Sequence, residues 1–277
     1  MKILNHRLLN DDGTACRYQP SPSVGGVLAA QYLVMHFTAG RDAASSIASL
    51  CNKASKASAH VVIGRDGGVT QLVPFNRVAW HAGVSRWQGL EGMNRYALGI
   101  ELDNAGRLDR VGSRWQAWFK ASYPDDEVLV ANHKNDAPGT PPYGWHTYTE
   151  VQIAAALEVA GLLVCKYALR DVLGHEDIAP GRKVDPGPDF PMASFRARLF
   201  GRDQDTEEVL MTTTALHIRV GAGAGYAALP ISPLPPGTRV EALQKQGNWW
   251  RVAVLDTVGG DMDVEGWVNS RFLRAAT

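Results

Sequence analysis

The chain has 277 residues, 28 basic and 28 acidic side chains with a formal net charge of zero, and 45% hydrophobic residues. This length is about twice that of a typical domain, so one large or two unequal domains are expected. The balanced charge gives no global attraction to nucleic acid or to an anionic membrane. No apolar run approaches the roughly 18 residues of a membrane span. We therefore expect a globular protein that binds neither.

Three cysteines, Cys16, Cys51 and Cys165, lie far apart and are odd in number. They predict neither a disulfide framework nor a thiolate metal cluster, and we expect them to be small buried residues. The first residues, Met1–Arg7, lack the apolar core and the small-residue cleavage site of a secretory signal. A cytoplasmic location is therefore expected, although delivery to the cell wall by another route stays open.

Residues 1–29 are polar and rich in turns, which predicts an irregular lead-in. The pattern then becomes that of alternating strands and helices, with Asp42 as a suitable N-cap and Asp66–Gly67 as a hairpin turn. The elements expected in chain order are a strand at 32–37, a helix at 43–53, a hairpin at 59–73 and a strand at 98–102.

From about 105 to 146 the periodicity fails and Pro, Gly and aromatic residues accumulate, so we expect an elaborated loop inserted into the domain. Thr149–Gln152 matches a capping box and opens a helix over 151–169. A short helix at 195–200 then closes the first domain. The apolar stripe of the long helix is predicted to pass through Ile153, Leu157, Ala160 and Val164.

A charged linker at 201–209 is followed by short alternating strands, separated by Gly and Pro turns and without a helical period. We therefore predict an α/β fold over 30–200, with a mixed central sheet flanked by helices, and a small all-β barrel domain over 210–277. The strands expected in the second domain are 216–220, 238–243, 249–254 and 265–268.

One segment, Gly174–Gly187, concentrates functional side chains: it holds His175, Lys183 and Asp185 among Gly and Pro residues. It is too rich in Gly and Pro to form a helix, and such a loop can direct three side chains to one point. Metal sites need this arrangement, because their ligand geometry is set before the ion arrives. A solvated surface loop with an incidental histidine is the alternative.

His36, at the end of a predicted strand, joins His175 and Asp185 to give two imidazoles and one carboxylate. A zinc hydrolase keeps three protein ligands and leaves the fourth position for water, and this mixed set suits Zn²⁺ better than Ca²⁺ or Mg²⁺. Glu101 is embedded in an apolar strand, where burial would raise its pKa and suit it to be a general base. Lys183 lies two residues before Asp185, so it would point the same way and stabilise an oxyanion.

Taken singly, these residues have simpler interpretations. His36 alone would be a packed histidine at a strand end, Glu101 an ion-pair partner and Lys183 a solvated surface lysine. Only their joint occurrence favours a site. Of the other histidines, His60 is expected to be structural, and those in the insertion, at 133 and 146, are not expected to be ligands.

Several gapless motifs, in order over about residues 30–200, resemble the zinc-dependent N-acetylmuramoyl-L-alanine amidases. These motifs are Val34–His36, Ser58–His60, Ala79–Gly83, Gly99–Leu102 and Gly174–Pro188. Members of that family hydrolyse the amide between the lactyl group of N-acetylmuramic acid and the first L-alanine of the stem peptide. The resemblance implies Zn²⁺ held by His36, His175 and Asp185. It also implies Glu101 as catalytic acid/base and Lys183 as the lysine that polarises the carbonyl.

Phage lysozyme-type members of the family carry Cys as third ligand and a Tyr near the metal. This chain has Asp185 and Glu101 instead, with Ala59 where that Tyr would be expected. It therefore resembles most the cytoplasmic amidases that recycle anhydro-muropeptides.

The resemblance also suggests residues that bind the substrate. Trp80 and His81 match a motif that lines the cleft, with a buried aromatic–histidine pair as the alternative. Lys56 and Arg182 are candidates to bind carboxylates of the stem peptide, with solvated charges as the alternative.

Residues 210–273 resemble a bacterial Src-homology-3-like domain, a kind that often binds cell-wall polymer. Trp249, Trp250 and Trp267 would form a stacking surface there, with core packing as the alternative for at least one. The expected partner is peptidoglycan or a soluble muropeptide. This domain favours a lytic role, whereas Asp185, Glu101 and the missing signal favour recycling. A non-catalytic peptidoglycan-recognition protein is the alternative function, although such binders usually lose a zinc ligand.

Overall fold

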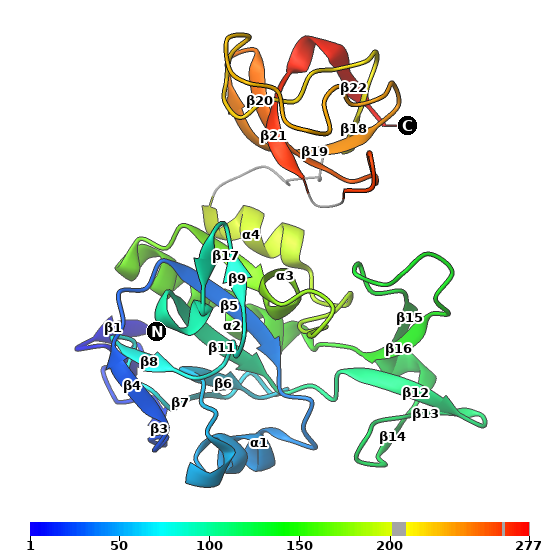
Figure 1. Ribbon diagram of the computed structural model, residues 1–277. Coiled ribbons are helices and arrows are strands. Elements are labelled where there is room, and N and C mark those ends of the chain that lie inside the picture. The colour runs from blue at the N-terminus through cyan, green and yellow to red at the C-terminus, as the bar shows by residue number, and fades with distance from the viewer. Residues whose placement is uncertain (201–208, 262–263, 277) are drawn as a thin grey trace. The chain divides into compact units, whose positions relative to one another are not determined.

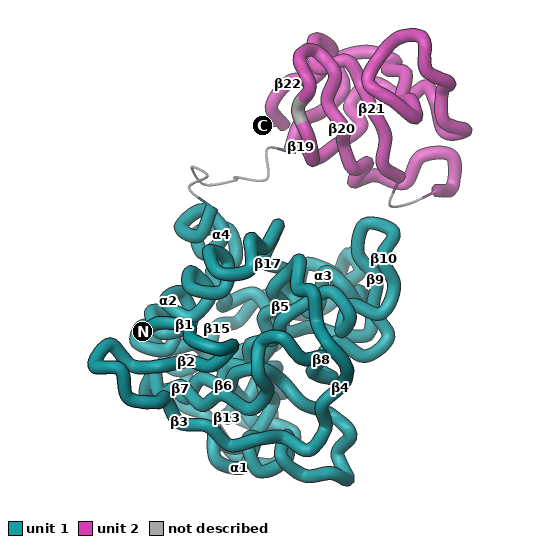
Figure 2. Tube along the Cα trace, turned by 90° about the vertical axis from the view of Figure 1, so that its left-hand side faces the viewer, with its two compact units in different colours: residues 1–202 teal, residues 203–277 magenta. Residues whose placement is uncertain are grey.

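The computed structural model describes residues 1–200, 209–261 and 264–276. The chain divides into two compact units, Met1–Arg202 and Asp203–Thr277, which Figure 2 colours separately. The predicted linker at 201–209 lies, apart from its last residue, outside the described residues. None of the helices in the described part of the chain has the length and apolar composition needed to span a membrane.

The first unit is built on a six-stranded sheet with the order β17-β5-β11-β6-β7-β3 (Figure 1). β17, β5, β11 and β6 run parallel, β7 is antiparallel to β6, and β3 is parallel to β7. The predicted mixed central sheet with helices is therefore confirmed. Its strands are β17 (Asp171–Gly174), β5 (Tyr32–Phe37), β11 (Ala97–Leu102), β6 (Val61–Ile63), β7 (Val69–Gln71) and β3 (Arg17–Tyr18). The helices are α1 (Ala43–Leu50), α2 (Glu150–Tyr167), α3 (His175–Ile178) and α4 (Met192–Phe200).

The two faces of β5 pack against different clusters, as the two-residue period of a strand requires. Leu33 and Met35 join the cluster that contains residues of α2, whereas Tyr32 and Val34 join a cluster on the opposite face. Ile100 of β11 also lies on the α2 side. Because His36 pairs with Glu101 in the parallel register, these two polar residues are neighbours on the face turned away from α2.

The long helix α2 begins as predicted but turns a slightly different face inward. Thr149 caps it by accepting a hydrogen bond from the backbone N–H of Gln152 at 3.2 Å. The side chain of Gln152 does not complete the capping box, because it points into the core. Its Nε2 donates to the carbonyls of Ile63 and Asp103 at 3.1 and 3.0 Å.

The buried face of α2 therefore differs from the predicted stripe, in which only Ala160 is fully buried and the other three residues pack at the margin. Cys165, which we expected to be buried, is exposed on this helix. The inward face consists of Gln152, Ala156, Val159, Ala160 and Leu163.

The insertion at about 105–146, for which an elaborated and partly structured loop was expected, contains more regular structure than that. It forms a five-stranded antiparallel sheet with the order β14-β13-β12-β16-β15, drawn in green in Figure 1. The strands are so short that no periodicity shows in the sequence. They are β12 (Arg107–Val111), β13 (Arg114–Gln116), β14 (Ser122–Tyr123), β15 (Val128–Ala131) and β16 (Tyr143–His146).

The lead-in at 1–29 also contains more structure than expected. Two of its strands form a hairpin, another is the edge strand β3 of the central sheet, and the fourth pairs with β8. The strands concerned are β1 (Lys2–Leu4), β2 (Arg7–Leu9), β4 (Val24–Val27) and β8 (Arg77–Ala79), and a separate hairpin is formed by β9 (Arg86–Trp87) and β10 (Leu90–Glu91).

The second unit contains a five-stranded antiparallel sheet with the order β21-β20-β19-β18-β22. The strand expected at 216–220 is absent: Leu216 and Arg219 take part only in isolated bridges. Trp250 packs against the core of this unit. The strands are β18 (Val209–Thr212), β19 (Arg239–Gln246), β20 (Trp249–Val254), β21 (Glu265–Asn269) and β22 (Leu273–Ala275).

Gln152→Leu tests the coupling of α2 to the sheet. It would leave the buried carbonyl of Asp103 without its Gln152 donor, whereas the carbonyl of Ile63 keeps the backbone N–H of Asp103 at 2.9 Å, so we expect the first unit to lose about 1–3 kcal/mol of stability. Urea denaturation followed by circular dichroism measures the change. Val151→Ala, at an exposed position of the same helix, is the control and should stay within about 0.5 kcal/mol. Equal stability of the two variants would contradict the role of Gln152 in joining α2 to the sheet.

Candidate metal centre and active site

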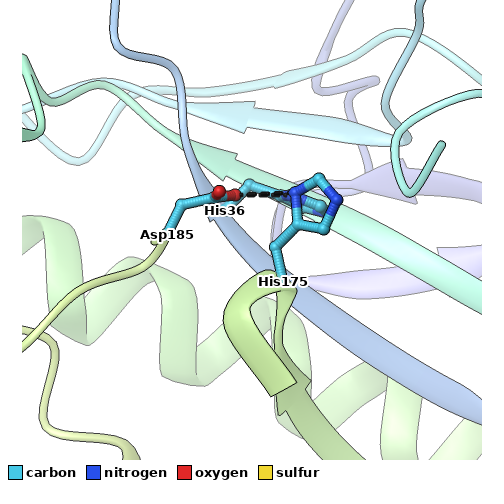
Figure 3. A group of neighbouring side chains, drawn as sticks. All are labelled: His36, His175 and Asp185. Carbon is cyan, nitrogen blue, oxygen red and sulfur yellow. Dashed lines mark hydrogen bonds and ion pairs between the residues drawn. The ribbon is translucent and has the colours of Figure 1, made fainter. Parts of the chain in front are cut away.

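Three buried side chains converge at the carboxyl ends of β5 and β17 (Figure 3). His36 lies near the end of β5, His175 follows β17 directly, and Asp185 lies in the loop after α3. His36 Nδ1, His175 Nδ1 and Asp185 Oδ2 are each 2.9 Å from the other two atoms. The structure thus brings together the three residues that the sequence analysis selected as ligands.

The second ring nitrogen of His175 has two neighbours. Nε2 lies 3.0 Å from the backbone carbonyl of Ala82, which can only accept a hydrogen bond, and 3.4 Å from Arg182 Nη2. The shorter contact favours the tautomer with its proton on Nε2, in which Nδ1 presents a lone pair to His36 and Asp185.

A longer chain of contacts sets the protonation state of His36. His81 Nε2 lies 3.2 Å from the carbonyl of Ala97, so it carries the proton of the neutral His81 ring. His81 Nδ1 is then an acceptor, and it lies 2.9 Å from His36 Nε2. His36 must donate from Nε2, which leaves its Nδ1 unprotonated.

Gly99 makes this contact chain possible. A Cβ at this position would lie 2.6 Å from the ring of His81 and would push the ring away from His36. The backbone of His81 is also held, because its N–H and that of Ala82 donate to Asn94 Oδ1 at 2.9 and 2.8 Å. We expected His81 to bind substrate or to belong to a buried aromatic–histidine pair, and the structure places its ring in contact with His36.

The side chains at this centre are in the states that bind a cation. Burial and the neighbouring His175 lower the pKa of His36 to about 4, so its ring is neutral at neutral pH. Burial alone would raise the pKa of Asp185, but the two imidazoles beside it hold that pKa below its usual range. Two imidazole lone pairs and one carboxylate oxygen therefore point at one another. Such an arrangement is repulsive unless a cation lies between them, so the donor set fits a metal ion.

Glu101 lies beside this centre, paired with His36 across β5 and β11. Burial and the neighbouring charge of Asp185 raise the pKa of Glu101 well above its usual value, against the opposing effect of Lys183. Its Oε2 is buried and has no hydrogen-bond partner among the described residues. Glu101 is thus a proton-carrying group held next to the candidate metal centre.

Lys183 is half-buried in the ligand loop. Its positive charge acts on both His36 and Glu101, lowering the pKa of each. Within the described parts of the chain, its ammonium group makes no ion pair or hydrogen bond with another side chain. The group is therefore available to a ligand at the centre.

The ligand loop is braced by a residue that the sequence analysis missed. Glu176 Oε2 accepts hydrogen bonds from the backbone of Gly187 at 3.1 Å and from His133 Nε2 at 2.6 Å. Its own N–H donates to the carbonyl of Asp185 at 2.9 Å. The loop also contains a single helical turn, α3, which the Gly and Pro content had led us to exclude. The sequence signal for the brace was an acidic residue directly after His175, and the structure shows that it is buried.

Of the other three proposed substrate-binding residues, Trp80 and Lys56 are not bonded to the three ligands, whereas Arg182 Nη2 lies 3.4 Å from His175 Nε2. Trp80 is 44% exposed and packs over Gly25 of β4. Lys56 is exposed at the end of a short 3-10 helix. Arg182 donates to the carbonyls of Ala82 and Val84 at 2.8 and 2.6 Å, so it fixes the segment that orients His175.

Two cavities flank this region. One, of about 410 Å³, includes Glu101 in its wall and is lined by α1 and by part of the insertion. The other, of about 660 Å³, lies between the Gly83–Arg95 region and the loop after α3. It contains Arg86, Arg95 and Arg182 together with Glu91, whereas the first cavity contains a single arginine, Arg41.

Comparison with known proteins decides the family. The family model described as N-acetylmuramoyl-L-alanine amidase matches residues 27–188, more than half of the chain. The chain belongs to this amidase family. It is 34% identical over 144 residues to the 1,6-anhydro-N-acetylmuramyl-L-alanine amidase AmpD of Citrobacter freundii, covering 51% of this chain and 57% of that protein. It is also 34% identical over 186 residues to the N-acetylmuramoyl-L-alanine amidase AmiD of Escherichia coli, covering 64% of this chain and 56% of that protein.

The chain thus spans less than two thirds of the length of these amidase relatives. Among solved structures, a selenomethionine derivative of AmpD superimposes with a TM-score of 0.45 at 29% identity, covering 69% of this chain and 99% of that one. The complex of Escherichia coli AmiD with anhydro-N-acetylmuramic acid-L-Ala-D-γ-Glu-L-Lys gives 0.46 at 28% identity, covering 68% of this chain and 63% of that one.

The raised pKa of Glu101 predicts how stability depends on pH in the metal-free protein. The folded state binds this proton more tightly than the unfolded state, so the contribution to stability is lost as the pH rises toward the folded pKa. Glu101→Gln keeps the shape without the charge. We expect its thermal midpoint to exceed that of the wild type by a margin that widens from pH 5 to pH 8.

Differential scanning fluorimetry with a chelator present measures this margin. Glu91→Gln, which removes an exposed carboxylate, is the matched control and should show no such trend. A constant difference between Glu101→Gln and wild type across this pH range would refute the prediction.

Proposed function

We propose that this protein is a zinc-dependent amidase that hydrolyses the bond between N-acetylmuramic acid, or its 1,6-anhydro form, and L-alanine. The observation that carries the proposal is the convergence of three unprotonated ligand atoms beside a buried glutamic acid. Membership of the amidase family supports the reaction class. The names of the relatives AmpD and AmiD support the muramoyl-L-alanine amide as the target.

Zn²⁺ is the ion that suits two imidazole nitrogens and one carboxylate oxygen, and His36, His175 and Asp185 would hold it. When bound, such an ion supplies Lewis acidity, which polarises a carbonyl and makes water more acidic. The protein holds both imidazoles in the tautomer that presents Nδ1, through Ala82 for one and His81 for the other. Ligand orientation is thus fixed without rearrangement.

Glu101 moves the protons in this proposal. As a carboxylate it accepts a proton from the attacking water, and as a carboxylic acid it returns that proton to the leaving amine. Its burial in an apolar strand raises its pKa and so favours the proton-carrying state, and its Oε2 has no hydrogen-bond partner among the described residues. Lys183 places its charge where the carbonyl oxygen becomes negative, which stabilises the tetrahedral transition state.

The second unit is, in this proposal, an Src-homology-3-like domain that binds cell-wall polymer. Its antiparallel sheet and its separate hydrophobic core support this fold. Trp249 and Trp267 are half-buried, and each leaves part of its ring accessible. A pull-down of the full chain on purified sacculi tests the assignment, with Trp267→Ala expected to reduce the bound fraction without loss of amidase activity on soluble substrate.

Two substitutions separate the proposed roles in the active site. Glu101→Ala should retain one zinc per chain and lose about 10²–10⁴-fold in kcat, because only the proton-transfer group is removed. His175→Ala should lose both zinc and activity, because the ion loses one of its three ligands. Elemental analysis of dialysed protein and product release from anhydro-muropeptide measure both. One zinc per chain in His175→Ala, or full activity of Glu101→Ala, would rule out the respective role.

His81→Phe tests the tautomer chain. The phenyl ring retains the packing against Gly99 but cannot accept the proton of His36 Nε2, so zinc affinity should fall about 10–100-fold. Competition with a fluorescent chelator gives the affinity. His81→Gln, which offers a carbonyl acceptor, should recover part of it, and His6→Phe, far from the centre in sequence and bonded to Tyr167, is the control. Wild-type affinity in His81→Phe would disprove the positioning role.

Mass spectrometry of products from two substrates decides between the biological roles. Release of stem peptide from soluble anhydro-muropeptides alone would indicate recycling, and release from intact sacculi would indicate wall lysis. A zinc-loaded protein that releases peptide from neither would be a recognition protein, the alternative function.

A further inference from the structure

A turn of the insertion, residues 133–136, contacts the loop that carries the metal ligands, although no histidine of the insertion was expected to be a ligand. His133 is 5% exposed and lies between β15 and β16. Its backbone N–H donates to Asp136 Oδ2 at 2.8 Å, and the N–H of Asp136 donates to the carbonyl of His133 at 3.0 Å. The backbone of His133 is thus held within the insertion itself.

The hydrogen bonds of the His133 ring make it a donor to the ligand loop. Nδ1 accepts the backbone N–H of Asn135 at 3.1 Å, and a backbone N–H can only donate. Nδ1 is therefore unprotonated, and the neutral ring carries its proton on Nε2. This atom lies 2.6 Å from Glu176 Oε2, which accepts the hydrogen bond. His133 is thus an oriented donor to a buried carboxylate.

Glu176 connects this donor to the metal ligands on both sides of it. It directly follows His175, and its backbone N–H donates to the carbonyl of Asp185 at 2.9 Å. The carboxylate oxygen that His133 contacts also accepts the N–H of Gly187 at 3.1 Å. The loop is therefore held at Asp185 and two residues beyond it, by one residue whose side chain is in turn held by His133.

Other residues of the insertion add contacts to the same part of the loop. Lys134 Nζ lies 3.1 Å from Glu176 Oε1, and Asn135 Nδ2 donates to the carbonyl of Glu176 at 3.1 Å. Trp145 of β16 packs on Gly187, where a Cβ would lie 2.9 Å from the indole ring. A carboxylate that is 5% exposed needs such donors. Among the described residues, both side chains that donate to this one belong to the insertion.

We propose that His133 is a positioning residue for the metal centre and acts through Glu176 on Asp185. His36 lies on a strand of the central sheet, whereas Asp185 lies in a loop that other side chains have to hold. A loop that is ordered before the ion arrives loses less conformational entropy on binding, so this support raises the metal affinity. The insertion thus contributes to the metal centre without supplying a ligand. The inference rests on the proposed zinc-dependent function and assigns a further residue to it.

Zinc affinity of three variants, measured by competition with a fluorescent chelator, tests this role. His133→Phe keeps a ring beside Trp145 but removes the donor, so the affinity should fall about tenfold. His133→Gln, whose amide can donate to Glu176, should recover most of it. The matched control is His146→Phe: His146 is also 5% exposed and belongs to the same insertion, but its ring accepts the N–H of Ala105, outside the ligand loop. Its substitution should leave zinc affinity unchanged.

Two outcomes of this measurement would overturn the proposal. Wild-type zinc affinity in His133→Phe would show that the metal centre does not depend on the contact with Glu176. Equal losses in His133→Phe and His146→Phe would show that any damage to the insertion lowers the affinity, which would leave His133 without a positioning role of its own.

Hydrogen exchange of the Gly187 amide, followed by NMR in the metal-free protein, gives a second readout that does not depend on zinc. This N–H is bonded to Glu176, so His133→Phe should speed its exchange severalfold, and His133→Gln should stay near the wild-type rate. His146→Phe should leave the rate unchanged. A wild-type rate in His133→Phe would contradict the support of the loop by this residue.

Together these measurements separate the inference from the proposed function. If the wild type binds no zinc while the Gly187 amide exchanges faster in His133→Phe, the positioning of the loop by His133 stands and the zinc-dependent function fails. If the wild type binds zinc and hydrolyses anhydro-muropeptide while His133→Phe equals it in zinc affinity and in amide exchange, the function stands and the positioning role fails.

Discussion

The parallel pairing of β5 with β11 is the constraint on which the rest of the site depends. In its register His36 lies opposite Glu101, and both side chains leave the sheet on the face that α2 does not cover. β17 continues the same register on the other side of β5, with Gly174 opposite Met35, so that His175 emerges at the same edge. A one-residue slip in this pairing would turn the side chain of His36 or Glu101 to the opposite face of the sheet, where the residues of α2 pack. The hydrophobic residues of β5 oppose that slip, because those on one face pack in one cluster and those on the other face pack in another.

Backbone carbonyls then determine how the site is protonated. A carbonyl cannot donate, so Ala82 and Ala97 fix the protons on His175 and His81, and His81 in turn fixes the proton on His36. In these tautomers two imidazoles face a carboxylate with their lone pairs. Holding this repulsive arrangement costs free energy of folding. A bound cation would relieve the repulsion, and this relief would contribute to its binding free energy. Gly99 makes this arrangement possible, because its lack of a side chain lets the ring of His81 pack directly on β11.

Much of the sheet and the grouping of His36, His175 and Asp185 could be predicted from the sequence. The apolar runs gave β5 and β11, and the loop after β17 combined a histidine and an aspartate with Gly and Pro residues. The inward turn of Gln152 could not be predicted, since the same Thr-x-x-Gln pattern serves equally as a capping box. The role of His81 depends on which atoms its two nitrogens face, and that information exists only in three dimensions. The insertion itself was expected, but its sheet could not be predicted because strands as short as Ser122–Tyr123 carry no measurable period.

The insertion touches the site at two separate points, and these contacts give it a function that its sequence does not suggest. His133 holds Glu176, which in turn holds both ends of the ligand loop through Gly187 and Asp185. Trp118, on a different turn of the same small sheet, reaches the loop after β5 through the carbonyl of Ala39. One folded element therefore contacts the loop that carries Asp185 and the loop that follows His36. Because a wall of the adjoining cavity belongs to the same element, the shape of that cavity and the positions of the ligands are mechanically linked. A substitution within the insertion core, at Leu108 for example, would disturb both together, whereas one at the exposed face of Trp118 would disturb the cavity alone.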